Sequence, residues 1–197
     1  MPIIAFPKEC YSKEKRCALL PSNAKTYKLM GAEVHFESGL GEHLHISDQQ
    51  YVEAGAMLNS SRRELLSSSA LVLTIHKLPE QDLSHLSGAV VISFLDPFNN
   101  DEYVQQLLMQ KITSFSMEMI PRSTRCQKMD ALSSQASLAG YVMVNKAMQY
   151  QQAIFPMMMT AAGTIKPAKV FVIGAGVAGL QAIATAKRLG AQVTAFD

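Results

Sequence analysis

Apolar residues occur along this chain in short blocks that predict strands, with periodic stretches between them that predict helices. Continuous apolar runs at residues 70–75 and 89–95 are typical of central parallel strands covered on both faces, and the short run at residues 2–6 suits an opening strand. Residues 33–37 and 112–117 predict two further strands. Because helical patterns alternate with these strands, the order predicts an α/β fold built on a doubly wound parallel sheet.

Two helical stretches carry specific predictions. In residues 99–110, a 3.6-residue period places Tyr103, Leu107 and Leu108 toward the core. A later stripe of small and apolar residues predicts one long helix that ends near Pro156 and connects two lobes. Its apolar face would consist of Ala136, Ala139, Met143, Ala147, Tyr150 and Ile154.

The last stretch, residues 169–197, predicts a strand, a glycine turn, a helix and a second strand in succession. Gly190 closes the helix. A lone GxGxxG motif is weak, but here it leaves an apolar strand and opens an amphipathic helix, which is the context of a dinucleotide-binding site. The candidate cofactor-binding residues are Gly174, Ala175, Gly176, Val177, Gly179 and Asp197.

The residue types in this motif have physical roles. Gly174 permits a tight turn, Gly176 lets the backbone approach a pyrophosphate, and Gly179 lets the helix pack closely on the strand. Asp197 lies 18 positions beyond Gly179, near the spacing of about 20 residues at which an acid binds the adenosine ribose. Because a 2′-phosphate there would meet like charge, the sequence predicts NAD(H) over NADP(H). The alternative is an ordinary strand–helix turn that uses glycine only for packing.

These elements predict two Rossmann-like lobes joined by a long helix. Residues 1–135 form the first lobe, residues 136–163 the connecting helix and linker, and residues 164–197 the start of the second lobe. A complete nucleotide-binding half has three strands, and only two are present here, so the second lobe is expected to be truncated. We expect an exposed apolar patch at Val170 and Val193, and weak or absent NAD affinity in this fragment.

Composition narrows the class of protein. The 197 residues are 48% hydrophobic, enough for one large or two small domains, and 18 basic and 16 acidic residues are spread along the chain, so no nucleic-acid partner is expected. Cys10, Cys17 and Cys126 form no CxxC pair and favour reduced thiols in the cytoplasm. No signal peptide and no transmembrane segment are expected.

Two other signals favour structural roles. Glu42, His43 and His45 lack a second ligand cluster, so no metal site is expected. Residues 157–159 are three methionines beside Phe155, and we expect them to fill a core or an interdomain contact rather than to bind a partner.

The segment PRSTRCQKMDALSSQ at residues 121–135, followed by Ala139-Gly140-Tyr141, is not explained by turns and caps. It resembles the RQD loop of the proton-translocating NAD(P) transhydrogenase α subunit. The resemblance extends over essentially the whole chain, because MPIIAFPKE, ESGLGE and TAAGTIKPAKVFVIGAGVAGLQA also fit the NAD(H)-binding domain I of that family.

The resemblance implies catalytic roles for Arg122, Gln127, Asp130 and Ser133, which would orient the dihydronicotinamide for hydride transfer. Their chemistry is compatible, since the guanidinium fork can hydrogen-bond a carboxamide or an acid, and Gln127 and Ser133 can both donate and accept. The alternative is a structural pair of Arg122 and Asp130 at a helix start, with Asp130 or Ser133 as the cap.

The family further implies an enzyme that exchanges a hydride between NAD(H) on this chain and NADP(H) on another domain. Proton movement would belong to a membrane domain that is not in this chain, and the Si-specific class of transhydrogenase is excluded. The fragment itself is expected to be inactive alone. The implied setting is a homodimer, peripheral to the bacterial inner membrane on its cytoplasmic side, without direct membrane insertion.

Alanine dehydrogenase is the related alternative. Its substrate-binding arginine and lysine match Arg16 and Lys77, but Asp96 stands where it has a catalytic histidine. A carboxylate is a poor substitute for an imidazole that polarises a keto acid, so Arg16 and Lys77 are expected to be scaffold or cleft residues. A third possibility is an NAD-binding module without catalysis.

Overall fold

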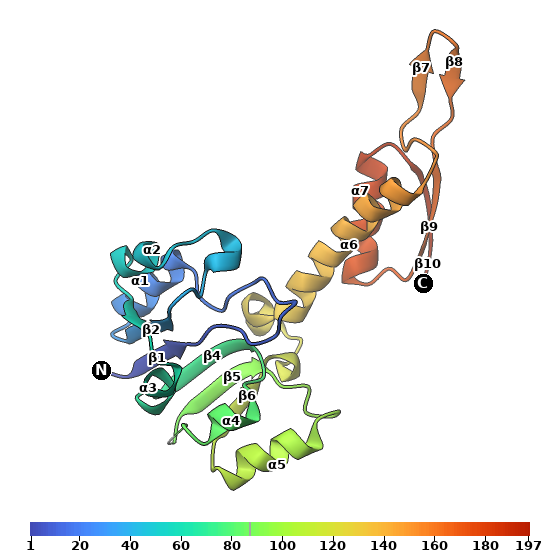
Figure 1. Ribbon diagram of the computed structural model, residues 1–197. Helices are drawn as coiled ribbons and strands as arrows, with labels where there is room; N and C mark the ends of the chain where they lie inside the picture. Colours follow the sequence, from blue (N-terminus) through green and yellow to red (C-terminus); the bar gives the residue numbers. More distant parts are fainter. Residues whose placement is uncertain (87) are drawn as a thin grey trace. The chain divides into compact units, whose positions relative to one another are not determined.

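The computed structural model describes residues 1–86 and 88–197, and the chain divides into two compact units (Figure 1). The first unit is Met1–Pro121 and the second is Arg122–Asp197. The segment 122–133 and the glycine turn therefore belong to the same unit.

The first unit is built on a six-stranded, fully parallel sheet in the order β3-β2-β1-β4-β5-β6. This is the strand order of a doubly wound dinucleotide fold, and it confirms the predicted fold class. The chain order reverses between β1 and β4, where Ile4 pairs with both Val34 and Leu71. The strands are β1 (Ile3–Phe6), β2 (Glu33–Glu37), β3 (Met57–Asn59), β4 (Leu71–His76), β5 (Val90–Phe94) and β6 (Thr113–Ser116).

Helices pack on both faces of this sheet, because alternate residues of each strand point to opposite sides. Phe6 belongs to one buried cluster, with Phe36 and Tyr51, whereas its neighbour Ala5 belongs to the other, with Val72. The helices are α1 (Pro21–Leu29), α2 (Asp48–Glu53), α3 (Arg62–Ser67), α4 (Glu80–Leu83) and α5 (Asp101–Met109), with short 3-10 helices η1 (Glu42–Leu44) and η2 (Met117–Met119).

The predicted inward face of α5 is only partly right. Tyr103 and Leu107 are buried, but Leu108 is 68% exposed. Residues 103 and 107 are four apart and share one helix face, whereas the next residue is rotated by about 100° away from it. Apolar character alone therefore misplaced Leu108.

The second unit contains the predicted strand–helix–strand arrangement. Strands β9 (Lys169–Ile173) and β10 (Gln192–Phe196) are parallel, and α7 (Val177–Arg188) connects them. The unit begins with η3 (Thr124–Met129) and the long helix α6 (Ala131–Tyr150), which lies beside α7 (Figure 1).

An antiparallel hairpin between α6 and β9 was not predicted from the sequence. It is formed by β7 (Met158–Thr160) and β8 (Gly163–Ile165), and every residue of both strands is exposed. The expectation that residues 157–159 fill a core is therefore wrong, since all three methionines are exposed, whereas the alternative of an interdomain contact stays a prediction. The run is too short to show the alternation that identifies a strand.

The predicted apolar face of α6 is also wrong. The buried residues of this helix are Gly140 and Val144, whereas Met143 is 63% and Tyr150 is 87% exposed. The face that packs is offset by one residue from the stripe of larger apolar side chains. Glycine has no side chain, so hydrophobic periodicity gives no signal for the position where the helix approaches its neighbour most closely. The helix also starts earlier than predicted, at Ala131, and ends at Tyr150 rather than near Pro156.

The exposed apolar patch exists, but not at the residues named from the sequence. Val170 and Val193 pack against the cluster that contains Val144 and Ala186, which covers one face of β9 and β10. The opposite face carries the exposed side chains of Phe171, Ile173 and Phe196. Since strand residues alternate between faces, the prediction chose the wrong set of alternate positions.

Candidate glycine-turn site and the strand edge of the first unit

The glycine turn joins β9 to α7 with an uncapped helix start. Gly174 has φ +92, a backbone conformation that favours glycine, and its N–H donates to the carbonyl of Phe196 at 2.8 Å. A Cβ on Gly179 would overlap the carbonyl oxygen of Gly174, so this glycine is needed for the close approach of helix and turn. At Gly176 the space is open, and a Cβ there would meet no atom within 4 Å.

The first turn of α7 has the features of an anion site. Its N-cap is Gly176, which offers no side-chain hydrogen bond, and the first turn contains no acidic residue. The first N–H groups of a helix lack intrahelical acceptors and lie at the positive end of the helix dipole. Lys187 and Arg188 occupy the last turn, where cations are favourable. The backbone at residues 176–179 can therefore hold a phosphate group.

Asp197 lies at the same edge as the glycine turn. Phe196 pairs with Ile173 in the last register position of the two parallel strands. Asp197 and Gly174 are the next residues, one at the carboxyl end of β10 and one at that of β9. Asp197 is exposed. The acid therefore directly follows the strand that lies beside β9 and the glycine turn.

Asp130 and Ser133 are brought together at the start of α6. Asp130 is the N-cap, and its carboxylate accepts hydrogen bonds from the amide of Ser133 at 2.8 Å and from the Ser133 hydroxyl at 2.6 Å. The hydroxyl and the amide of Ser133 lower the pKa of Asp130, with a smaller contribution from the charge of Arg122. The structural capping role that the sequence allowed as an alternative is therefore present, and it leaves a second Asp130 function open.

Arg122 and Gln127 differ from this pair. Both are exposed, and their side chains make no hydrogen bond among the described residues. Gln127 lies in η3, and its carbonyl accepts from the amide of Asp130 at 3.3 Å. A guanidinium and a carboxamide are thus presented to solvent beside a loop whose end is fixed by the cap.

In the first unit, the edge where the strand order reverses is occupied by the chain's own carboxylates. The Glu9 carboxylate accepts from the amides of Ile75 at 2.6 Å and His76 at 3.1 Å. The Glu14 carboxylate accepts from Arg16 Nε at 2.8 Å and Nη2 at 2.6 Å, and lies 2.8 Å from His76 Nε2. Hydrogen bonding from Arg16 lowers the pKa of Glu14 to about 2, despite burial.

The two candidate substrate residues of an alanine dehydrogenase are engaged here. The guanidinium of Arg16 is held by Glu14, and Lys77 Nζ donates to Asn100 Oδ1 at 2.6 Å while lying 5.1 Å from the centre of the Tyr103 ring. Asp96 has φ +48, and its amide donates to the Glu118 carboxylate. Both cations thus have partners within the chain.

Three glutamates that organise this edge were missed from the sequence. Glu9 holds amides at the end of β4, Glu14 holds Arg16, and Glu118 holds the amides of the two residues that follow β5. An available signal was an acid shortly after a predicted strand, as in Glu9 after residues 2–6 and Glu118 after 112–117.

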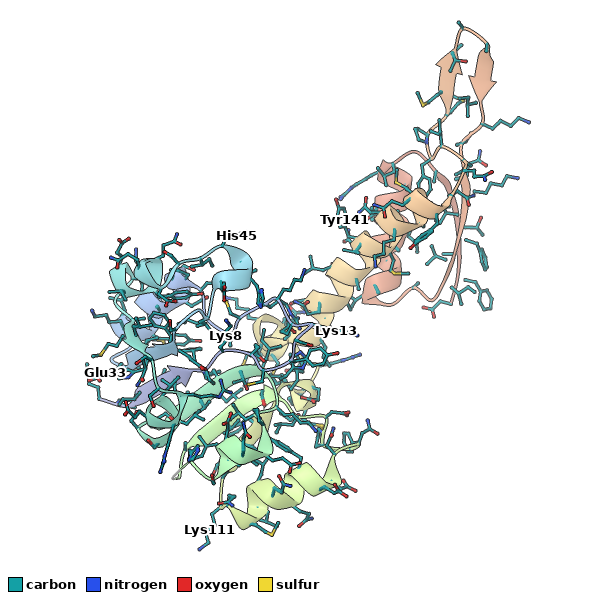
Figure 2. The ribbon with its side chains drawn as sticks, viewed as in Figure 1. Lys8, Lys13, Glu33, His45, Lys111 and Tyr141 are labelled. Atoms are coloured by element: carbon teal, nitrogen blue, oxygen red, sulfur yellow. The ribbon has the colours of Figure 1, made fainter. Side chains whose placement is uncertain are left out.

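The histidine segment forms the short helix η1 and its end. Glu42 accepts a hydrogen bond from Lys8 Nζ at 2.8 Å, and His45, marked with Lys8 in Figure 2, adopts φ 57 at the end of η1. Among residues 1–86 and 88–197, no three metal-binding side chains form a group that could hold an ion. No helix in the same residues is long and apolar enough to cross a bilayer.

A glycine turn with an open helix start, an acid at the next strand and a doubly wound parallel sheet together define a nucleotide-binding type of α/β protein. The chain belongs to the alanine dehydrogenase/PNT family. The model of the N-terminal domain of this family matches residues 5–139, and that of its C-terminal domain matches residues 143–197.

Individual relatives place the chain nearer to transhydrogenases than to alanine dehydrogenases. It is 44% identical over 201 residues to the first portion of NAD(P) transhydrogenase subunit alpha of Rhodospirillum rubrum, covering 98% of this chain and 52% of that protein. The crystal structure of transhydrogenase from Sinorhizobium meliloti matches 99% of this chain and 58% of its own with a TM-score of 0.93 and 44% identity. A structure of L-alanine dehydrogenase, matched over 99% of this chain and 54% of its own, gives 0.85 and 27%. The chain spans about half the length of such transhydrogenase alpha-subunit relatives.

Proposed function

We propose that this chain supplies the NAD(H)-binding part of a proton-translocating NAD(P) transhydrogenase. The observation that carries the proposal is the open N-terminus of α7 at Gly176, with Asp197 directly after β10, whose last residue Phe196 pairs with Ile173 of β9. Membership of the alanine dehydrogenase/PNT family supports it, as does the greater identity to transhydrogenase than to alanine dehydrogenase.

The cofactor would be held through its pyrophosphate and ribose. The amides of residues 177–179 would donate to the pyrophosphate, and open space at Gly176 admits its approach. The Asp197 carboxylate would accept from the adenosine ribose hydroxyls and repel a 2′-phosphate, so NADH is preferred over NADPH. When bound, the dihydronicotinamide supplies the hydride.

The segment 122–133 would orient the nicotinamide end. Asp130 and Ser133 form a fixed pair, whereas Arg122 and Gln127 present free donors and acceptors to a carboxamide. These residues act by positioning the ring for transfer, so no general base is required. Arg122 can also stabilise the ionised state of Asp130, since its charge lowers the pKa of that group.

The remaining parts of the reaction belong to partners. The hydride acceptor would be NADP(H) on a second domain, and proton movement would belong to a membrane domain. We further propose a homodimer that is peripheral to the cytoplasmic side of a bacterial inner membrane. The names of the relatives, which are alpha subunits or portions of one, support the need for other subunits.

The proposal is tested in the transhydrogenase complex assembled with the subunit that carries this chain. We expect hydride transfer from NADPH to an oxidised NAD analogue, and no NADH oxidation with pyruvate and ammonia. Oxidation of NADH by pyruvate and ammonia would instead support the alanine dehydrogenase alternative. Binding of NADH without any transfer, in the presence of the NADP(H)-binding domain, would identify a non-catalytic module.

A further inference from the structure

At Gly140, α6 lies in close contact with the first turn of α7. This glycine is buried, and a Cβ built on it would overlap the carbonyl oxygen of Ala178 and lie 3.1 Å from Cβ of Gln181. Ala178 belongs to the first turn of α7, whose amides form the anion site. Only glycine fits here unless one helix moves, because the obstacle is backbone rather than a flexible side chain.

The same helix carries two of the candidate nicotinamide-side residues at its N-terminal end. Asp130 caps α6, and Ser133 lies in its first turn. With a rise of about 1.5 Å per residue, the seven residues from Ser133 to Gly140 span ~10 Å. One rigid helix therefore sets the distance between the capped loop and the first turn of α7.

We propose that Gly140 is a positioning residue that holds the pyrophosphate turn at a set distance from residues 122–133. This inference rests on the proposed function, because it assigns the pyrophosphate to the first turn of α7 and the nicotinamide to residues 122–133. Gly140 touches neither the cofactor nor the reacting atoms; it acts through α6 and α7.

The packing around the contact determines what a larger residue would do. Gly179 fits against Gly174 so closely that the turn and the start of α7 must move as one body. Farther along α6, Val144 lies in a buried cluster with Phe155, Ala168 and Ala186. A methyl group at position 140 would therefore displace α7 together with its turn, without deforming the turn itself. Binding of the ADP half should survive, whereas alignment of the nicotinamide should not.

The test is Gly140→Ala in the assembled transhydrogenase complex. We expect the inhibition constant of ADP-ribose against NADH to stay within about twofold, while the single-turnover rate of hydride transfer falls on the order of 10²-fold, as for a misplacement of about 1 Å. The matched control is Ala139→Ser, an exposed neighbour on the same helix turn, for which both values should stay unchanged. Alanine favours helix over glycine, so loss of helix propensity cannot explain a slower rate.

A second variant serves if Gly140→Ala does not fold. Insertion of one alanine after the exposed Gln135 leaves the contact of α6 with α7 intact, but turns the capped loop by about 100° and moves it by about 1.5 Å. We expect the same result: unchanged ADP-ribose inhibition and a large loss of transfer rate. One alanine inserted between Ala161 and Ala162, at the tip of the exposed hairpin, is the control and should leave the rate unchanged.

A packing control separates stability from positioning. Val144→Ala removes buried methyl groups from α6 without pushing α7, so it should lower the melting temperature while leaving the transfer rate of the folded enzyme unchanged. If Gly140→Ala has the same transfer rate as the wild type, or weakens ADP-ribose and NADH equally, the positioning role is wrong and the proposed function stands. If the wild-type complex transfers no hydride, the proposed function itself is wrong.

Discussion

Two edges of parallel strands in this molecule have the same topology, but their backbone amides have different partners. In the first unit, the carboxyl ends of β1 and β4 present amides of Ile75 and His76, and the carboxylate of Glu9 occupies them. In the second unit, the carboxyl ends of β9 and β10 present the helix start at Gly176, and no acid of the first turn covers it. A parallel edge provides donors for an anion, and the presence of an internal carboxylate decides whether a ligand can use them.

The cations of the two units differ in the same way. Arg16 and Lys77 are bonded to Glu14 and Asn100, so they are neutralised or held by the chain itself. Arg122, in contrast, is exposed and makes no side-chain hydrogen bond within the described residues. The first edge is therefore a closed edge, because its donors and cations are bonded within the chain. The second is an open edge, because its donors are available to a ligand.

The largest expected effect comes from closing the open edge. Gly179→Ala forces a Cβ into the carbonyl of Gly174, which must distort the turn. We expect NADH binding to the assembled enzyme to weaken by at least about 10²-fold, equivalent to about 2.7 kcal/mol. Isothermal calorimetry measures it, and circular dichroism at 222 nm checks that α7 is retained. Unchanged affinity would mean that the cofactor does not use this turn.

A smaller effect is expected from Arg122→Ala, which removes an exposed cation from the unit that contains the glycine turn. The guanidinium is exposed and unbonded in the described chain, so its loss should not alter packing. We expect the single-turnover rate to fall by tens of fold, about 2 kcal/mol, with the NADH dissociation constant changed by less than about threefold. Arg63→Ala, at a residue of α3 in the first unit, is the charge-matched control. An unchanged rate in the intact enzyme removes Arg122 from the site.

Asp197 should control the choice between cofactors. We expect the wild type to bind NADH more tightly than NADPH, and Asp197→Ala to reduce this preference by about tenfold through the loss of like-charge repulsion. Titrations of both cofactors by the fluorescence of the reduced nicotinamide give the ratio. A wild type that prefers NADPH contradicts the assignment of this acid to the ribose.

Substitutions at the closed edge should change the unfolding free energy of the first unit rather than the affinity for the cofactor. Glu14 has its pKa lowered to about 2 from 4.5, so its contribution is present above about pH 4.5 and is lost as the pH falls through about 2. Because Arg16 and His76 are partly exposed, we expect Glu14→Gln to lower the unfolding free energy of the first unit by only about 1 kcal/mol at pH 7. Urea unfolding at pH 7 and pH 3 measures this.

The difference between Glu14→Gln and the wild type should shrink at pH 3, where the wild-type carboxylate begins to take up protons. Glu53→Gln, an exposed acid in α2, is the control and should show little effect at either pH. A difference that grows toward acid pH would contradict the ion pair as its source.

Sequence patterns predicted the elements better than the contacts between them. The parallel strands, the glycine turn and the order strand, helix, strand were predicted because they depend on local periodicity and on the conformational freedom of Gly174. The packed face of α6 was wrong because it is set by Gly140, whose contact with α7 depends on residues 38 positions away along the chain (178 minus 140).

The partners of the amides at the two edges likewise could not be predicted from the sequence. Glu9 meets the amides of residues 75 and 76 only after β1 and β4 pair, since these groups are far apart in the chain. A local pattern shows an acid after a strand, but not which amides it will reach. Among the candidate residues, the pairing of Asp130 with Ser133 could be predicted, because a helix N-cap bonds the third residue that follows it.

The most direct test of the contrast between the two edges is a backbone amide NMR titration of the 197-residue chain with NADH at millimolar concentration, which detects the weak binding expected of this fragment. The amides of residues 174–179 should shift as NADH is added, whereas those of Ile75 and His76, held by Glu9, should not. Shifts at residues 75 and 76 with none at the glycine turn would show that the first unit holds the anion site, and would contradict the account.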